Sequence, residues 1–403
     1  MTSISFALVL CIAGAASSQD TQLAALHDTL SKLSRQGATA SGQGRSKGLD
    51  LTPTKHQLRD WIETQLGALK HPGEEEALAY RINNALKPVS VTNEKDWENG
   101  LGSLGEVRIS NESGILIVIT AVGIICGYDQ SAYGYKFING RWQRIWESEQ
   151  DNYTPDKYTP QHIAAVYVWQ TYTNPDAVGP IFIMTLGHCW WCSSAWHPVY
   201  YRVWRVDSPG SKLLIDKTEG AYQGNGEYGV GTVAGEWHDE NAPVDVLVEF
   251  TEGSIDADVH HREAVRHFLI EGDQIRRVDP VALSPRDFVD EWLTRGWDEA
   301  ATWSESLNLQ QWHRRLHSDL VFGTFGNPTM HCQSPDLWQV SLEPHNTEKD
   351  FGPKAEVYFL VRWRPPYHFT MANISDKPWP NCTKEDRSAD ERRTLFATQE
   401  RRW

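Results

Sequence analysis

The stretch YGYKFINGRWQRIWE, residues 133–147, carries the clearest structural signal in this chain of 403 residues. Aromatic and branched residues alternate with others on both sides of Asn139-Gly140, a dipeptide typical of a two-residue hairpin turn. Alternation with period two places successive side chains on opposite faces of a strand. The stretch therefore predicts two antiparallel strands, 133–138 and 141–147, joined by a tight turn.

Further short segments with the composition of strands lie on both sides of this hairpin. They cover residues 106–110, 115–125, 163–172, 180–186, 200–206, 212–216, 244–250, 263–271 and 274–278. A run of short antiparallel strands is typical of a sandwich, an open barrel or an irregular propeller-like sheet. We therefore expect a central antiparallel β domain over residues 104–283.

Helical patterns precede this domain. Residues 52–69 and 74–86 carry apolar side chains at helical spacing, which predicts a helical hairpin within residues 49–103. The stretch before it, residues 19–48, is rich in polar and small residues. We expect it to be a flexible linker with a frayed helix at residues 21–33.

A second helical region follows the central domain. Ser284 has the character of a helix cap and Pro285 suits the first helical position, so a helix is predicted to begin there. Another helix is expected over residues 298–316. Together they predict a helical connector over residues 284–320.

The last part of the chain returns to strands. Residues 337–342 and 356–364 predict a small C-terminal β module over residues 321–383, which is followed by a charged tail at 384–403. The fold class expected for the whole chain is therefore α+β, with mainly antiparallel sheets.

The composition is that of an ordinary globular protein with an excess of wide aromatic rings. The sequence has 18 Trp, 14 Tyr and 12 Phe, and its formal net charge is −15. Most of these rings are expected in sheet cores, and the others could form stacking surfaces for sugars, peptides or bases. An acidic chain without a run of Lys and Arg repels phosphate backbones, so nucleic acid is not an expected partner.

The first eighteen residues have the pattern of a secretory signal peptide. Ile4–Ile12 is apolar, and the small residues Ala13–Ser18 follow it, where a signal peptidase could cleave. No Lys or Arg precedes the apolar run. The other long apolar run, Ile115–Cys126, is too short for a membrane helix. We expect an exported protein, periplasmic or secreted, without a transmembrane segment in the mature chain.

The most compact group of residues that can bind metal or undergo redox chemistry is His188, Cys189, Cys192 and His197. Two Cys at this spacing can form a disulfide in an oxidising compartment, bind Zn²⁺ together with histidines, or exchange thiols and disulfides. A second Cys pair of this spacing is missing from the sequence, and a strand follows the motif where a redox fold has a helix. A small structural disulfide is therefore expected, and zinc is the cofactor that the alternative would require.

Two other cysteines flank the C-terminal strands. Cys332 and Cys382 are expected to form a disulfide, since paired thiols are favoured outside the cytoplasm. A bridge across so long a segment restricts the unfolded chain and stabilises the module that it closes.

Asp256, Asp258 and His260 alternate along the chain, so a strand would place their side chains on one face. Such a face could bind a metal ion or carry acid–base chemistry. The residues just before it have the composition of a loop, in which charged side chains are simply solvated. Both interpretations stay open at this point.

The leading functional hypothesis is a non-catalytic binding or structural protein of the cell envelope or extracellular space, with carbohydrate or another envelope protein as partner. One alternative is a secreted carbohydrate hydrolase, for which Glu147, Glu149 and Glu249 at strand ends are noted. Such an enzyme needs two carboxylates about 5–10 Å apart. The other alternative is a metal-binding or redox protein centred on Cys189 and Cys192.

Overall fold

The chain forms two compact units, Met1–Glu219 and Gly220–Trp403, here called the N-terminal unit and the C-terminal unit. Their boundary lies inside the stretch 104–283 that the sequence assigns to one β domain. The computed structural model describes residues 19–35, 50–69, 73–91, 100–124, 127–150, 161–174, 177–189, 198–207, 210–219, 231–234, 244–256, 261–278, 282–319, 323–326, 329–345, 356–364 and 368–385.

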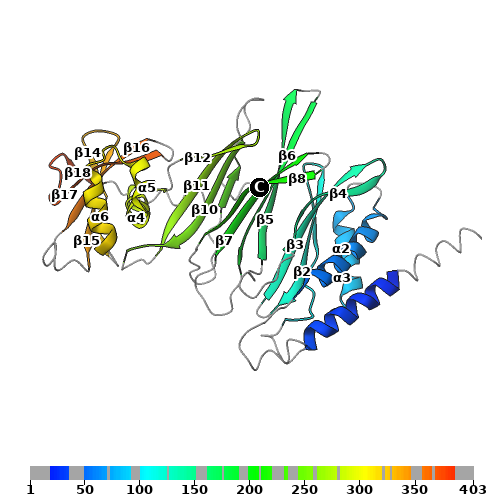
Figure 1. Cartoon of the computed structure of the whole chain (residues 1–403). Coiled ribbons are helices and arrows are strands. Elements are labelled where there is room, and N and C mark those ends of the chain that lie inside the picture. The colour runs from blue at the N-terminus through cyan, green and yellow to red at the C-terminus, as the bar shows by residue number, and fades with distance from the viewer. Residues whose placement is uncertain are drawn as a thin grey trace, which may run out of the picture. The chain divides into compact units, whose positions relative to one another are not determined.

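The N-terminal unit contains two four-stranded antiparallel sheets, each with its strands in sequence order (Figure 1). The strands of the first sheet are β1 (Arg108–Glu112), β2 (Ile115–Ile124), β3 (Gly127–Ile138) and β4 (Arg141–Ser148). Those of the second are β5 (Gln161–Asn174), β6 (Ala177–Cys189), β7 (Val199–Asp207) and β8 (Gly210–Glu219).

The predicted hairpin joins β3 to β4. Asn139 and Gly140 both have positive φ, 52° and 80°, as a type I′ turn requires. Ile138 pairs with Arg141 directly across this turn.

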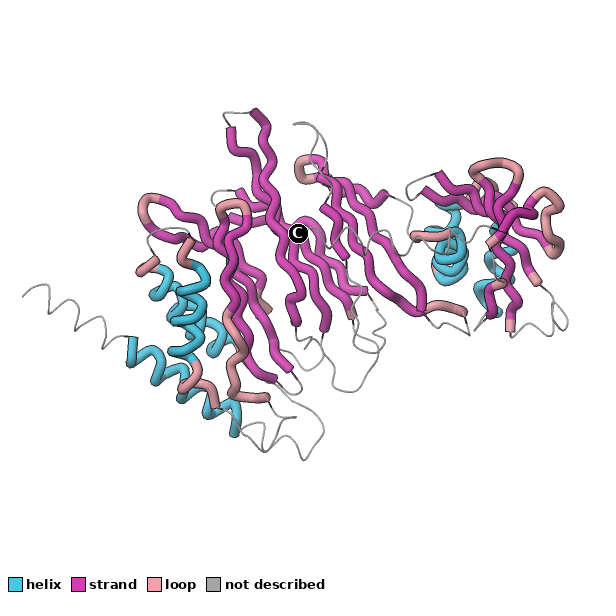
Figure 2. Tube along the Cα trace, turned by 180° about the vertical axis from the view of Figure 1, so that it is seen from behind, coloured by secondary structure: helices cyan, strands magenta, loops and turns pink. Residues whose placement is uncertain are grey.

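The first sheet lies between a helical layer and the second sheet (Figures 1 and 2). All ten residues of β2 are buried, because both of its faces are covered. On one face Leu116 shares a core with Ile62 of helix α2. On the other face Ile117 shares a core with Ile183 of β6.

The helical layer contains α2 (Thr52–Leu66), α3 (Glu75–Leu86) and a helix over residues 19–35. The sequence predicts a frayed helix at residues 21–33, and the structure has a helix over residues 19–35. Leu26 and Leu30 recur at helical spacing and are fully buried in the same core as α2, so tertiary packing stabilises this helix along its length. Residues 36–49 lie outside the described part of the chain.

Gly123 of β2 lies where the backbone of the segment before β1 approaches the strand closely. A Cβ at Gly123 would lie 2.0 Å from the backbone oxygen of Gly100, so only glycine lets the segment before β1 pack against this strand. The Gly123 N–H donates to the backbone oxygen of Ser103 at 2.8 Å, which holds the two segments together.

The C-terminal unit also has two antiparallel sheets. The strands of one sheet are β9 (Gly231–Ala234), β10 (Val244–Gly253), β11 (His261–Glu271) and β12 (Gln274–Val278). Those of the other are β13 (Gly323–Phe325), β14 (Met330–Cys332), β15 (Leu337–Pro344), β16 (Val357–Arg364), β17 (His368–Ser375) and β18 (Cys382–Glu385). A disulfide joins Cys332 of β14 to Cys382 of β18, which is the pairing expected from the sequence.

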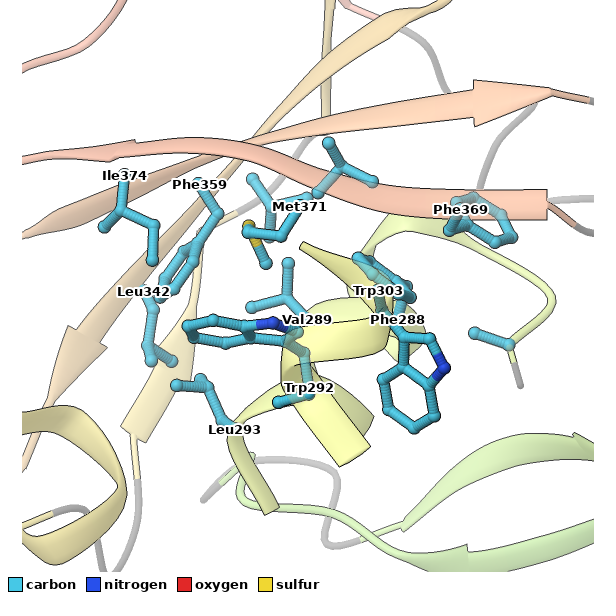
Figure 3. Packing of buried hydrophobic residues seen from close by; sticks show 14 of the residues in the cluster. Phe288, Val289, Trp292, Leu293, Trp303, Leu342, Phe359, Phe369, Met371 and Ile374 are labelled. Atoms are coloured by element: carbon cyan, nitrogen blue, oxygen red, sulfur yellow. The ribbon is translucent and has the colours of Figure 1, made fainter. Parts of the chain in front are cut away.

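The helices of this unit share one core with its larger sheet. Trp292 and Phe288 of α4 (Pro285–Thr294) pack among Phe359, Met371 and other apolar residues of β15–β17 (Figure 3). α4 begins as predicted, since the Ser284 hydroxyl accepts a hydrogen bond from the Asp287 N–H at 3.1 Å. The helices expected to connect domains are thus part of a packed unit.

The helix expected over residues 298–316 is broken into three pieces: α5 (Trp297–Ala300), the 3-10 turn η1 (Ala301–Trp303) and α6 (Leu309–Asp319). The break has a tertiary cause. Ser304 pairs with Met371 of β17 as a parallel bridge, and the Glu305 N–H donates to the Met371 oxygen at 3.0 Å. Pairing with a strand edge replaces helical hydrogen bonds in this segment.

Buried ion pairs connect α4 to β10 and β11. Arg262 of β11, which is 3% exposed, contacts the carboxylates of Glu252, Asp290 and Glu291. Arg266 lies beside the same Glu252 and Glu291 carboxylates, at 3.4 and 3.6 Å. Charges this deep in a protein are tolerated only when they are paired, so the network joins helix and sheet within this unit.

The fold class predicted from the sequence is confirmed. The described residues form a mixed α+β structure dominated by antiparallel sheets, with helices near the N-terminus and a six-stranded sheet near the C-terminus. None of the helices in the described ranges is long and apolar enough to cross a membrane.

Candidate functional site

A group of charged and aromatic side chains lies between α2 and the β3–β4 hairpin. We call it the α2–β4 cluster, and its members are His56, Arg59, Glu63, Tyr133, Tyr135, Arg144, Glu147 and Glu149. Helical spacing of three and four places the α2 members on one face of that helix. Alternation along β3 and cross-strand register place both tyrosines beside the charged residues of β4.

Glu149 lies at the centre of the cluster and is nearly buried, with 5% of its side chain exposed. The Tyr133 hydroxyl donates a hydrogen bond to its carboxylate. His56 Nε2 lies 3.0 Å from Glu149 Oε1, and Arg59 Nη1 lies 3.7 Å from Oε2. A phenol, an imidazole and a guanidinium thus surround a single carboxylate.

Two carboxylates share one guanidinium in this cluster. Arg59 Nη1 lies 3.8 Å from Glu147 Oε2 and 3.7 Å from Glu149 Oε2. Arg144 Nε approaches the same Glu147 oxygen at 3.4 Å. The arrangement pairs a buried acid with an accessible one, since half of the Glu147 side chain is exposed.

The cluster continues toward the hairpin turn. Glu63 accepts a hydrogen bond from the Tyr135 hydroxyl at 3.3 Å and forms an ion pair with Arg144 at 3.2 Å. Beyond Tyr135, Phe137 and Trp142 face each other across the strands, with ring centroids 5.2 Å apart and edge-to-face geometry. The aromatic pair therefore borders the charged residues.

The pKa directions follow from burial and from neighbouring charges. Burial, reinforced by the Glu149 charge, raises the pKa of Tyr133 well above its usual value. Burial and the nearby Glu63 raise the pKa of Tyr135 in the same way. Burial by itself would lower the pKa of Arg59, but its carboxylate neighbours outweigh this and hold it above the ordinary value. At neutral pH both phenols are donors and Arg59 is charged.

A buried ion pair fixes α2 against the sheets. The side chains of Lys55 and Asp129 are both 0% exposed, and Lys55 Nζ lies 3.0 Å from Asp129 Oδ2. Lys55 Nζ also donates to the Gln150 backbone oxygen at 3.3 Å, while Asp129 Oδ1 accepts from the Gln161 N–H at 3.1 Å. Because Lys55 precedes His56, this pair anchors the helical turn that presents the cluster.

Sequence reasoning noted part of this cluster and missed the rest. Glu147 and Glu149 are two of the strand-end carboxylates that the hydrolase alternative requires, and the structure brings them together beside Arg59. Glu249 lies in β10, in the other unit. His56, Arg59 and Tyr133 were missed because contacts between a helix and a distant hairpin leave no local pattern in the sequence.

The predicted metal or disulfide motif is only partly described. His188 lies in β6 and is buried, and its ring centroid lies 4.5 Å from that of His162, its register partner on β5. Cys189 ends β6, while Cys192 and His197 lie outside the described residues. Within the described ranges, no three His, Cys, Asp or Glu side chains are grouped as metal ligands. A disulfide or a zinc site at this motif stays a prediction.

The second predicted polar site lies in the C-terminal unit. Asp256 is buried and forms an ion pair with Arg286. Asp258 and His260 lie outside the described residues. Asp256 is thus paired with a residue of α4, and a polar site formed with Asp258 and His260 stays a prediction.

No protein-family model matches the chain, and no curated protein matches it. Matching solved structures include the family 93 α-L-arabinofuranosidase of Fusarium graminearum with arabinobiose, at 9% identity and a TM-score of 0.28, covering 71% of this chain and 67% of that one. A family 43 enzyme of a Bacteroides ovatus xyloglucan locus matches at 11% identity and a TM-score of 0.20, covering 72% and 46%. A thermostable family 43 glycoside hydrolase matches at 8% identity and a TM-score of 0.21, covering 73% and 82%. At these TM-scores the matches carry no argument about this chain.

Proposed function

We propose that this chain is an exported protein that binds carbohydrate at the α2–β4 cluster. The observation that carries the proposal is the sharing of Arg59 by Glu147 and Glu149 beside two phenol donors. Sugar hydroxyls act as both donors and acceptors, so the exposed Glu147 carboxylate and His56 imidazole can bind several of them together. The buried Tyr133 and Tyr135 hydroxyls donate to Glu149 and Glu63 and hold those carboxylates in place.

The cluster also offers apolar contact at its border and is open to solvent. Phe137 and Trp142 pack against each other beyond Tyr135, and 38% of Phe137 is exposed. Rings of this kind pack against the apolar C–H faces of sugars. The side chains of His56 and Glu147 are 45% and 50% exposed, so a ligand can reach them. Glu149, which lies beside His56 in the cluster, is nearly buried.

Export is supported by the apolar run Ile4–Ile12 with the small residues that follow it, and by the disulfide Cys332–Cys382. The test is the intact mass of the protein recovered outside the cytoplasm, with and without thiol alkylation. We expect a chain that lacks residues 1 to about 18, with Cys332 and Cys382 protected from alkylation. Recovery of a full-length chain only from the cytoplasm, with both thiols reactive, would refute export.

Binding is tested by calorimetry of the mature protein against a panel of soluble oligosaccharides. Replacing Arg59 with alanine removes the cation that Glu147 and Glu149 share. A hydrogen bond between a charged side chain and a sugar hydroxyl contributes about 1.5–3 kcal/mol. We therefore expect the affinity to fall about tenfold or more. The matched control is Arg202→Ala on β7, which removes an arginine that pairs with Asp216 outside the cluster. Equal affinity in both variants, or no binding to any sugar, would refute the proposal.

Hydrolysis is the second candidate, and the surroundings of Glu149 favour it. A carboxylate that accepts a phenol hydrogen bond and lies 3.0 Å from an imidazole nitrogen can move a proton to or from a bound sugar. The same incubations decide between the two functions by chromatography of the products. Shortened oligosaccharides that disappear in Glu149→Gln would establish an enzyme, whereas intact sugars at saturating protein would leave binding alone.

A further inference from the structure

The α2–β4 cluster carries more acidic groups than permanent cations. We infer that its preferred ligand is an oligosaccharide that carries free amines, such as a glucosamine oligomer, ahead of neutral and acidic sugars. This inference rests on the carbohydrate-binding function proposed above and adds the ligand class to it.

Acidic groups outnumber cations in and beside the cluster. Asp60 extends it, since Arg59 Nε donates to Asp60 Oδ1 at 3.2 Å. The carboxylates are Asp60, Glu63, Glu147 and Glu149, and the permanent cations are Arg59 and Arg144. His56 adds a positive charge only when it is protonated. The local charge is therefore negative at neutral pH, as is that of the whole chain, −15.

The two arginines are occupied by carboxylates inside the cluster. Arg59 uses Nε for Asp60 and Nη1 for Glu147 and Glu149. Arg144 approaches Glu63 with Nη1 and Glu147 with Nε. A carboxylate, sulfate or phosphate on a ligand would have to displace one of these partners and would meet the surplus of negative charge.

Glu147 is the acid best placed to accept a ligand cation. Half of its side chain is exposed, and its contacts to Arg59 and Arg144, at 3.8 and 3.4 Å, exceed the usual N–H···O hydrogen-bond range of about 2.7–3.2 Å. Glu149, by contrast, is nearly buried and holds a phenol hydrogen bond. An ammonium group can approach Glu147 without breaking a short hydrogen bond.

The strength of such a contact sets the size of the expected preference. Exposed ion pairs contribute little, so one ammonium–carboxylate contact gives about fivefold in affinity, and salt screens it. The neutral sugar keeps the hydrogen bonds and ring contacts, and so still binds. The acidic sugar loses affinity because it is repelled.

The experiment compares three hexamers of matched length by calorimetry with the mature protein at mildly acidic pH and low salt: glucosamine, N-acetylglucosamine and galacturonic acid. We expect the glucosamine hexamer to bind about fivefold more tightly than the acetylated one, with the acidic hexamer weakest. Glu147→Gln should abolish the difference between the first two, measured as the ratio of their affinities within the variant. High salt should have the same effect on wild-type protein.

The control is Glu112→Gln, the same change at an exposed position of β1, which should keep the preference. Equal affinity for the amine and acetylated hexamers, or tightest binding of the acidic one, would overturn the inference and leave carbohydrate binding standing. A preference that persists in Glu147→Gln would also overturn it. Failure of all three hexamers to bind would instead count against the proposed function itself.

Discussion

Replacing Arg262 with methionine is expected to destabilise the C-terminal unit by about 3–5 kcal/mol. Arg262 is buried and contacts the carboxylates of Glu252, Asp290 and Glu291. Burial lowers its pKa to about 10, so it keeps its charge at neutral pH. Methionine preserves much of the volume and removes the cation, which leaves buried carboxylates with less compensation.

The measurement is urea unfolding of the intact chain, followed by fluorescence and compared with Arg202→Met. Arg202 forms an exposed pair with Asp216 at 2.8 Å, and its loss should cost less than about 1 kcal/mol. If Arg262→Met lowers the free energy of unfolding as little as the control does, the buried carboxylates do not require the Arg262 cation. The double variant Arg262→Met with Glu291→Gln should recover part of the loss, because one buried charge is removed with its partner.

The stability lost in Arg262→Met should also depend on pH. Burial already raises the pKa of Asp290, even beside Arg262. Without the arginine the folded-state pKa values of the neighbouring carboxylates rise further, and a group with a raised folded pKa stabilises the fold only while it is protonated. The difference between variant and wild type should therefore be full at neutral pH. It should shrink as the pH falls through the raised carboxylate pKa values.

Replacing Lys55 with methionine is expected to destabilise the N-terminal unit by about 3 kcal/mol or more. Lys55 and Asp129 are both completely buried, and their contact is 3.0 Å long. The substitution leaves the Asp129 carboxylate without its cation, although Asp129 still accepts from the Gln161 N–H. The pair joins α2 to β3 and β5, so its loss weakens the contact between the helical layer and both sheets.

The same unfolding measurement applies, with Asp129→Asn as the informative partner change. Asparagine keeps an oxygen that can accept from Gln161 and carries no charge, so Lys55→Met with Asp129→Asn should be more stable than Lys55→Met alone. If the double variant is the less stable one, the deficit comes from lost packing around Lys55 and not from an unpaired carboxylate.

Local patterns were sufficient for most of the strands and for the ends of some helices. The turn at Asn139-Gly140 needs two residues with positive φ, and the sequence supplies them between alternating apolar residues. Ser284 and Pro285 mark the start of α4 because capping and a proline at the first helical position are short-range effects. These signals depend on neighbours within a few residues, so they can be read without the fold.

Other elements depended on partners distant in the chain. The helix over residues 19–35 is weakly marked by its polar composition, and the burial of Leu26 and Leu30 beside α2 stabilises it. The segment around Ser304 has a helical pattern, yet it pairs with Met371, 67 residues away in the numbering, and leaves the helix. Propensity is a weak preference that such tertiary contacts outweigh.

The amino-acid sequence by itself determined the fold class and the two-residue turn of the central hairpin, because hydrophobic period and turn chemistry are local properties. It also marked Cys332 and Cys382 as a pair, since each flanks the strands of one small module. Only the tertiary structure decided that Arg59 lies between Glu147 and Glu149 beside Tyr133, and that Arg262 is buried among acids of α4. In the sequence, charged side chains on a helix and on a distant strand have the pattern of solvated surface residues. Their chemistry depends on burial and proximity, which only tertiary packing determines.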